Sequence, residues 1–208
     1  MLSNALAIAE EILSPASTRL ADRGWLRATA GNLSLKMSGD PLTIAITRSG
    51  SDKQQLTSQD LILVVDGEVI AGTGIPSAET PIHQVIYELT DATAIYHVHT
   101  VYNNVVSRFA QDHVLTLSGS EMVKALGFWA ENAAVRLPVI PNYADISRVA
   151  ETIRTRLDPK IPGVLLENHG LYAFGPSPDS AMRHCEAFEF LFEWLHLDHT
   201  ARPSTLSS

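Results

Sequence analysis

The stretch "LILVVDGEVIAG", residues 61–72, contains two apolar runs separated by Asp66 and Gly67. An Asp-Gly pair accommodates the positive backbone angles of a two-residue turn, so the two runs are predicted to pair as an antiparallel hairpin. The segment "PLTIAITRSG" (41–50) and the alternating apolar pattern of residues 33–37 indicate further strands just before it. This part of the chain is therefore predicted to form antiparallel strands.

Helical patterns flank these strands. Apolar residues recur at helical spacing over residues 3–22, and Thr80 and Pro81 suit the N-cap and the first position of a helix that runs to Leu89. The remaining predicted elements are helices over 144–157 and 178–198 and a strand pair over 163–175, "GVLLENHGLYAFG". This order of elements predicts an α/β layered domain built around a mostly antiparallel sheet.

Length and composition restrict the class of protein. The 208 residues suit a single domain, 1–208, with residues 1–4 and 200–208 expected to fray. A net charge of −8 with scattered basic residues argues against nucleic-acid binding. The single cysteine, Cys185, fits a reducing compartment. No apolar run approaches the roughly 20 residues of a membrane-spanning helix. A soluble, cytoplasmic protein without nucleic-acid or membrane partners is therefore expected.

Two histidines lie one residue apart in "IYHVHT", residues 95–100, a run that otherwise has the pattern of a buried strand. His97 and His99 would share one face of that strand, about 6.5–7 Å apart along the backbone, and could bind one metal ion. A pair of histidines on a solvated strand face is the alternative. Catalytic zinc sites normally have three protein ligands. His169, beside Gly170 at the end of an apolar run, is the best candidate for the third ligand.

Three short segments have the composition of phosphate-binding loops. They are "TAGNLS" (29–34), "TRSGSDK" (47–53) and "IPSAET" (75–80). Each combines small residues with hydroxyl or amide donors, and the backbone N–H groups of such loops can face an anion. Each segment taken alone is more often an ordinary turn, but three converging loops could hold one phosphate. Lys53 is a candidate counter-charge, although a lone lysine in this context is more often solvated.

Two carboxylates are candidates for proton transfer. Glu121 follows "SGS" in "LSGSEMVKALG" (117–127), at a predicted helix start where serine capping and the helix dipole stabilise a carboxylate. A purely structural role would explain that position. Near a divalent cation, however, a partly desolvated carboxylate could move protons on and off a carbon beside a carbonyl. Glu79, just before the helix that leads to His97, is the competing candidate.

The motifs "TAGNLS", "TRSG", "PSAETPIH", "HVHT" and "NHGLYAFG" follow one another in an order that resembles the class II aldolase and adducin superfamily. The resemblance covers about residues 5–198. It implies a class II aldolase-like fold, three-layer α/β/α with a mostly antiparallel central sheet, and a reaction on a phosphorylated sugar with a divalent metal. It also implies a homotetramer with sites near the subunit interfaces.

The resemblance assigns roles to individual residues. It implies that His97, His99 and His169 bind the metal. Zinc is the expected ion, although three imidazoles also suit iron, cobalt or nickel. The residues implied to line the substrate and phosphate site are Asn32, Ser49, Gly50 and Ser77, with Glu79 beside them.

The segment "GSEMVKALG" (119–127) resembles one branch of the superfamily, the dehydratases that remove water from methylthioribulose 1-phosphate in methionine salvage. That resemblance implies Glu121 as the acid/base and 2,3-diketo-5-methylthiopentyl 1-phosphate as the product. In the aldolases the acid/base corresponds to Glu79, so aldol cleavage or 4-epimerisation of a small sugar phosphate is the alternative. A non-enzymatic adducin-like module is a further alternative, and the three candidate histidines argue against it.

Overall fold

The computed structural model describes residues 2–201, which contain one nine-stranded sheet with the strand order β4-β3-β2-β1-β5-β9-β8-β7-β6. Neighbouring strands pair antiparallel except β7 and β8, which are parallel. The mostly antiparallel sheet expected from the sequence is confirmed. The strands are β1 (Asn32–Gly39), β2 (Leu42–Thr47), β3 (Leu61–Val65), β4 (Glu68–Ala71), β5 (Ala94–Val98), β6 (Val114–Leu117), β7 (Val135–Ile140), β8 (Gly163–Leu166) and β9 (Gly170–Gly175).

The hairpin predicted over residues 61–72 is formed by β3 and β4. Its turn residues Asp66 and Gly67 have positive φ angles of 46° and 90°. Val65 pairs with Glu68 across the turn. Because glycine adopts positive φ without steric cost and aspartate tolerates it better than most residues, this dipeptide fits the turn that the strands require.

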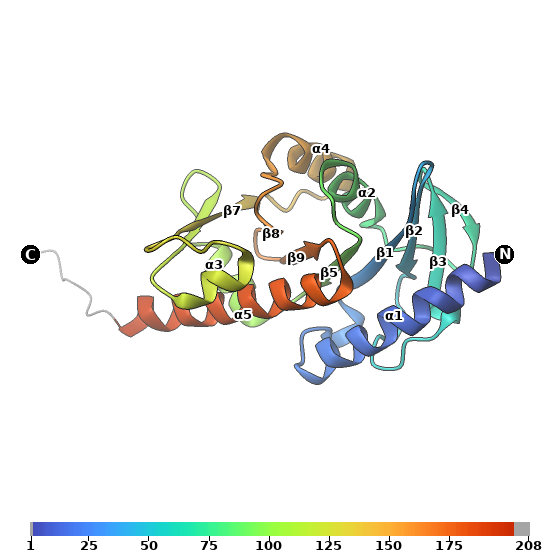
Figure 1. Ribbon diagram of the computed structural model, residues 1–208, viewed down its shortest axis with the longest axis horizontal. Helices are drawn as coiled ribbons and strands as arrows, with labels where there is room; N and C mark the ends of the chain where they lie inside the picture. The colour runs from blue at the N-terminus through green and yellow to red at the C-terminus, as the bar shows by residue number, and fades with distance from the viewer. Residues whose placement is uncertain (1, 202–208) are drawn as a thin grey trace, which may run out of the picture.

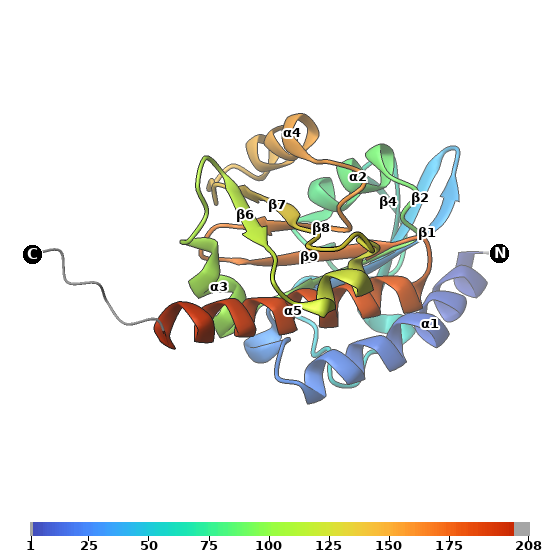
Figure 2. The same ribbon diagram turned by 60° about the vertical axis from the view of Figure 1, so that its left-hand side comes forward.

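Helices cover both faces of the sheet (Figures 1 and 2). On one face, α1 and α5 pack on a core that includes Leu13 and Phe188, and on the other face α2 and α4 pack on a core that includes Ile86 and Ile153. The three-layer α/β/α arrangement is therefore confirmed. The helices are α1 (Leu2–Asp22), α2 (Thr80–Leu89), α3 (Val101–Ser107), α4 (Ile146–Arg156) and α5 (Pro178–Ala201), with short 3-10 helices η1 (Arg27–Thr29), η2 (Ser58–Asp60) and η3 (Glu121–Leu126).

Strand alternation connects the sequence pattern to these two cores. In β2, Ile44 and Ile46 enter the core under α2 and α4, whereas Ala45 enters the core under α1 and α5. In β3, Ile62 belongs to the core under α2 and α4, and Leu63 to the core under α1 and α5. Strands covered on both faces read as continuous apolar runs rather than strict alternation, which explains the run "LILVV".

The helix boundaries differ from the predicted ones at several places, and α4, predicted over 144–157, covers residues 146–156. Helix α2 begins at Thr80 with Glu79 in the N-cap position, one residue earlier than predicted, and the Thr80 hydroxyl donates to the Ser77 carbonyl instead of capping the helix. Helices α1 and α5 extend over residues 2–4 and 200–201, which were expected to fray. The rest of that prediction, at residues 1 and 202–208, lies outside the described residues. Among residues 2–201, no helix is long and apolar enough to cross a membrane.

Candidate metal centre and active site

Strand β5 brings the histidines of "HVHT" to the centre of the sheet. His97 lies within β5 and is fully buried, and His99 lies just beyond the strand end, with its Nε2 atom 2.8 Å from the Nε2 atom of His97. His169 joins them from the turn between β8 and β9, because β9 pairs with β5. One ligand atom from each histidine lies within 4.8 Å of the others. The structure therefore brings together the three histidines that the sequence singled out.

Hydrogen bonds at the Nδ1 atoms orient two of the three histidine rings. The Nδ1–H group of His97 donates to the carbonyl of Leu171 at 3.0 Å, and the Nδ1 atom of His169 lies 3.2 Å from the amide oxygen of Asn142. Such bonds fix the tautomer and direct the Nε2 lone pair to a metal. Both Nε2 atoms consequently face the interior of the cluster, in the arrangement that a three-histidine metal site needs.

Gly170 allows the rings to approach one another. A Cβ atom at this position would lie 2.5 Å from the carbonyl oxygen of Val98, 2.8 Å from a ring carbon of His97 and 2.9 Å from a ring carbon of His99. These distances are shorter than van der Waals contact, so any larger residue would displace the strand or the rings. The glycine next to His169 is therefore required by the close packing of the cluster.

The histidines are held in the form that binds metal. Burial lowers the pKa of His97 to about 4 and the pKa of His99 to about 3, and in both cases the Glu79 carboxylate opposes the shift. Both imidazoles are therefore neutral near pH 7, and neutral imidazole is the ligand form. Three imidazoles match the donor set of catalytic zinc sites, which leave a further position open. The residues present thus fit a divalent transition metal.

Glu79 lies inside this cluster. Its Oε2 atom is 3.3 Å from His97 Nε2 and its Oε1 atom is 3.1 Å from His169 Nε2, and the Asn32 side-chain amide donates to Oε2. Burial disfavours the charged form, but His97, His169 and Asn32 outweigh it and hold the pKa of Glu79 well below its usual range. Glu79 is consequently a fixed anion at the centre, and its side chain makes no capping hydrogen bond at the start of α2.

Two residues of the centre were not found by sequence reasoning. His83 is fully buried in α2, where its Nδ1 atom lies 2.7 Å from the Ser34 hydroxyl and its Nε2 atom contacts the Asn32 amide oxygen. This contact turns the Asn32 amino group toward Ser77 and Glu79. The ring of Tyr172 stacks on His97 with centroids 3.8 Å apart. Neither residue belongs to a metal-ligand spacing in the sequence, so the pattern held no direct signal for them.

The three polar loops converge beside the histidines. Asn32 donates to the Ser77 hydroxyl at 3.1 Å, and the backbone N–H of Ser49 donates to the carbonyl of Ile75 at 2.9 Å. Gly50, with a φ of 71°, forms the bend after Ser49. These contacts join residues 29–34, 47–53 and 75–80 into one surface that includes Glu79.

Lys53 differs from the solvated lysine that is usual for such a sequence. Its side chain is only 3% exposed, and its ammonium group donates to the carbonyls of Thr29 and Ser51. Burial lowers its pKa, opposed by nearby acidic groups including Asp52 and Glu79. Lys53 therefore ties two of the polar loops together and places a positive charge beneath them.

Glu121 lies at the start of η3, where the Ser120 hydroxyl accepts a hydrogen bond from the backbone N–H of Met122. The capping role of the serine is confirmed. The Glu121 side chain is 86% exposed and forms an ion pair with Lys124. Within the described part of a single chain, no recorded contact joins Glu121 to the three histidines. The Glu121 side chain is therefore exposed at the surface of the single chain.

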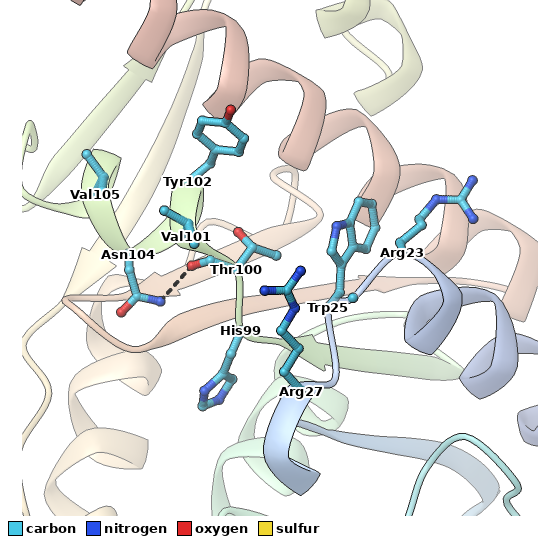
Figure 3. A pocket seen from close by; sticks show the side chains of 10 residues that line it. Arg23, Trp25, Arg27, His99, Thr100, Val101, Tyr102, Asn104 and Val105 are labelled. Carbon is cyan, nitrogen blue, oxygen red and sulfur yellow. Dashed lines mark hydrogen bonds between the residues drawn. The ribbon is translucent and has the colours of Figure 1, made fainter.

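A pocket of about 530 Å³ lies beside His99. Figure 3 shows Trp25 and Arg27 on one side of it and Val101 and Tyr102, from α3, on the other. The backbone N–H of His99 donates to the carbonyl of Trp25 at 3.0 Å, which attaches this wall to the metal-ligand strand. A ligand in the pocket would thus contact both apolar and cationic groups next to His99.

The buried histidines lead to a prediction about acid stability. Burial lowers the pKa of His83, like that of His97, to about 4, whereas an unfolded histidine titrates near about 6.5. Below that pH the unfolded chain takes up protons that the folded chain refuses, so the stability of the metal-free protein should fall as pH drops from about 6.5 to about 4. Glu189, whose pKa is raised to about 7 by burial, works in the opposite direction but is a single group.

Denaturant titrations of the metal-free protein at several pH values would measure this slope. The His83→Asn variant should show a shallower slope, because one of the buried neutral histidines is gone. Stability that stays constant or rises on acidification through this window would contradict the account.

Comparison with known proteins identifies the family. Residues 11–196 match the family described as Class II Aldolase and Adducin N-terminal domain. The chain is 45% identical over 190 residues to a methylthioribulose-1-phosphate dehydratase from Persephonella marina, covering 90% of this chain and 88% of the relative. It is 42% identical over 186 residues to a protein of the same name from Bacillus subtilis, covering 88% of this chain and 89% of the relative.

The fold is shared with a solved enzyme structure. An L-fuculose-1-phosphate aldolase from Thermus thermophilus aligns with a TM-score of 0.74 at 22% identity, covering 96% of this chain and 98% of that chain. The class II aldolase-like fold is therefore confirmed. Together with the sequence matches, this places the chain in the class II aldolase and adducin family and, within it, in the family of the methylthioribulose-1-phosphate dehydratases.

Proposed function

We propose that this protein is a metal-dependent hydro-lyase that dehydrates methylthioribulose 1-phosphate to 2,3-diketo-5-methylthiopentyl 1-phosphate. The observation that carries the proposal is the cluster of His97, His99 and His169, with one ligand atom from each within 4.8 Å of the others. It is supported by 45% identity to a relative with this activity in its name. The reaction takes the proton from C3 and the hydroxyl group from C4, and the resulting enol becomes the diketone.

We assign the metal to the three imidazoles, with Zn²⁺ as the proposed ion. A divalent cation held there would act as a Lewis acid toward the substrate carbonyl and would stabilise the negative charge that develops when the C3 proton leaves. The chain contributes the orientation: His97 is fixed by the Leu171 carbonyl and His169 by Asn142. Glu79 adds a negative charge beside two of the ligands.

We propose that Glu121 transfers the protons and that it reaches the site of another subunit in a homotetramer. A general base works best when its pKa lies near the operating pH. The pKa of Glu79 is held far below that range by His97, His169 and the hydrogen bond from Asn32, so its carboxylate is a weak base. Glu121 is exposed and free of the cluster in its own chain. Its availability to a second copy supports the assignment.

Aldol cleavage is the second candidate, because Glu79 lies where the aldolases are expected to carry their acid/base and contacts both His97 and His169. Removal of metal with a chelator, followed by addition of Zn²⁺, Co²⁺ or Mn²⁺, tests the shared requirement of both reactions. Turnover should disappear and return. Full activity of thoroughly metal-depleted protein would contradict both candidates.

The substrate phosphate is proposed to bind at the joined polar loops. The Ser49 side chain is exposed at their surface, while its backbone N–H is engaged by Ile75. Ser49→Ala should therefore raise KM for the phosphorylated substrate about ten-fold, the effect of one charge-assisted hydrogen bond, and leave kcat nearly unchanged. Steady-state kinetics would measure this. Ser147→Ala, an exposed serine on α4, is the matched control, and an unchanged KM for Ser49→Ala would exclude its hydroxyl from phosphate binding.

A further inference from the structure

A carboxylate outside the three-histidine cluster is buried where α5 meets α3. Glu189, on α5, is 5% exposed. Its Oε2 atom accepts a hydrogen bond from the Thr100 hydroxyl at 2.6 Å, and its Oε1 atom accepts one from the Asn103 side-chain amide at 2.9 Å. Both oxygens of the carboxylate are therefore directed at the N-terminal turn of α3, immediately after His99.

Thr100 and Asn103 hold the backbone on both sides of His99. Thr100 accepts from the backbone N–H of Asn103 at 3.0 Å, and Asn103 accepts from the backbone N–H of Thr100 at 3.2 Å. The Asn103 amide also donates to the carbonyl of Val98 at 3.1 Å. Val98 and Thr100 flank His99, so the direction in which His99 leaves the strand depends on this reciprocal pair.

The same helix fixes the segment that carries the third histidine. The Asn104 amide donates to the carbonyl of His169 at 2.7 Å, and the Ser107 hydroxyl accepts from the backbone N–H of Asn168 at 2.9 Å. Helix α3 thus contacts the end of β5 and the turn between β8 and β9. A shift of its first turn would change the position of His99 relative to His169.

Burial of Glu189 is unfavourable for folding. Burial raises its pKa to about 7, against the hydrogen bonds from Thr100 and Asn103, which lower it. The charged form is therefore less stable in the folded chain than in water. Burial of a carboxylate costs free energy that its hydrogen bonds offset only in part, so a gain in stability does not by itself account for a carboxylate at this position.

We propose that Glu189 is a positioning residue for the three-histidine centre: through Thr100 and Asn103 it sets the first turn of α3 and thereby the placement of His99 relative to His97 and His169. The inference rests on the proposed metal site. Partners that orient metal ligands commonly change metal affinity or activity by about 10–100-fold when they are removed. Glu189 contacts Thr100 and Asn103 rather than a histidine, so it would act on the backbone that carries His99. Metal affinity and activity would report this effect as well.

The test measures metal affinity and ligand geometry rather than activity. Purified full-length variants are stripped of metal, and their affinity for Zn²⁺ is determined by competition with a chromophoric chelator. The visible absorption of the Co²⁺ form reports the coordination geometry. Glu189→Ala should weaken Zn²⁺ binding about ten-fold or more and alter the Co²⁺ spectrum. Glu189→Gln should retain most of the affinity, because its oxygen can accept from Asn103 and its amino group can donate to Thr100.

Two further variants separate positioning from a general effect on the helix. Glu186→Gln lies on α5 three positions earlier and pairs with Arg19 and Arg23, so it should bind Zn²⁺ like the wild type. Thr100→Val keeps the branched shape but removes both the hydrogen bond to Glu189 and the cap on the Asn103 N–H, so it should weaken binding even if Glu189→Ala fails to fold. Thermal unfolding of the metal-free forms provides the comparison for stability.

The possible results test the proposed metal site and the proposed role of Glu189 separately. Wild-type protein that binds no metal through its histidines would contradict the proposed metal site itself. Tight binding by the wild type, together with unchanged affinity and an unchanged Co²⁺ spectrum in Glu189→Ala or, where that variant does not fold, in Thr100→Val, would overturn the positioning role alone. Equal weakening in Glu186→Gln would also overturn it.

Discussion

Replacing His99 with alanine is expected to abolish tight metal binding and to reduce dehydration by at least about 10³-fold while the protein stays folded. The three imidazoles converge on one point, and the loss of one leaves two protein ligands, fewer than catalytic zinc sites use. A bound cation supplies several kcal/mol of transition-state stabilisation, and each 1.4 kcal/mol or so corresponds to a factor of ten. Metal analysis and kcat/KM on the same preparations would measure both effects.

His99 is the cleanest of the three ligands for this test. It lies beyond the end of β5 and is only partly buried, whereas His97 is fully buried and stacks on Tyr172. His97→Ala would therefore also leave a cavity in the core, which carries its own cost. His199→Ala, an exposed histidine on α5, is the matched control and should behave like the wild type. Full metal content and turnover in His99→Ala would contradict the three-histidine site.

The second large effect is expected from Glu121→Gln. This substitution keeps the size and part of the hydrogen bonding but removes the base, so kcat should fall about 10²–10⁴-fold with metal still bound. Exchange of the C3 proton with solvent should stop as well. Glu79→Gln should instead change substrate affinity or metal occupancy more than the chemical step, because Glu79 contacts His97 and His169 directly. The opposite ranking of the two variants would assign proton transfer to Glu79 and favour aldol cleavage.

Mixing of subunits tests whether Glu121 acts across an interface. When Glu121→Gln and His99→Ala chains are expressed together, a mixed oligomer would contain some sites with an intact Glu121 from one chain and an intact His99 from the other. Activity should then rise clearly above that of either variant alone. Mixed oligomers that remain inactive would place both residues in the site of a single chain.

Local patterns were enough to predict several elements. The Asp66-Gly67 turn needs positive φ at both residues, and this requirement is visible in the residue types. The H-x-H spacing and a third histidine beside a glycine indicated which three side chains would meet, and the family resemblance favoured metal binding over a solvated histidine pair. The turn is visible in two adjacent residues, and the histidine cluster is visible in residue types that commonly bind metal.

Other features depend on contacts between distant parts of the chain. His83 contacts Ser34 and Asn32, which lie 49 and 51 residues away in the sequence. The residues around His83 in its own helix give no sign of these contacts. Lys53 is buried because the carbonyls of Thr29 and Ser51 surround its ammonium group. A single sequence does not show which segments will meet, so it could not indicate that either side chain is buried.

The most direct test of the central claim is the product formed from methylthioribulose 1-phosphate by the Zn²⁺-loaded protein, identified by mass spectrometry. We expect one product that keeps all the carbon atoms of the substrate and has lost one molecule of water. We also expect that metal-depleted protein and His99→Ala leave the substrate unchanged. Two shorter fragments would show carbon–carbon cleavage, and an unchanged substrate with fully metal-loaded protein would show that this sugar phosphate is not dehydrated here. Either result would contradict the proposed function.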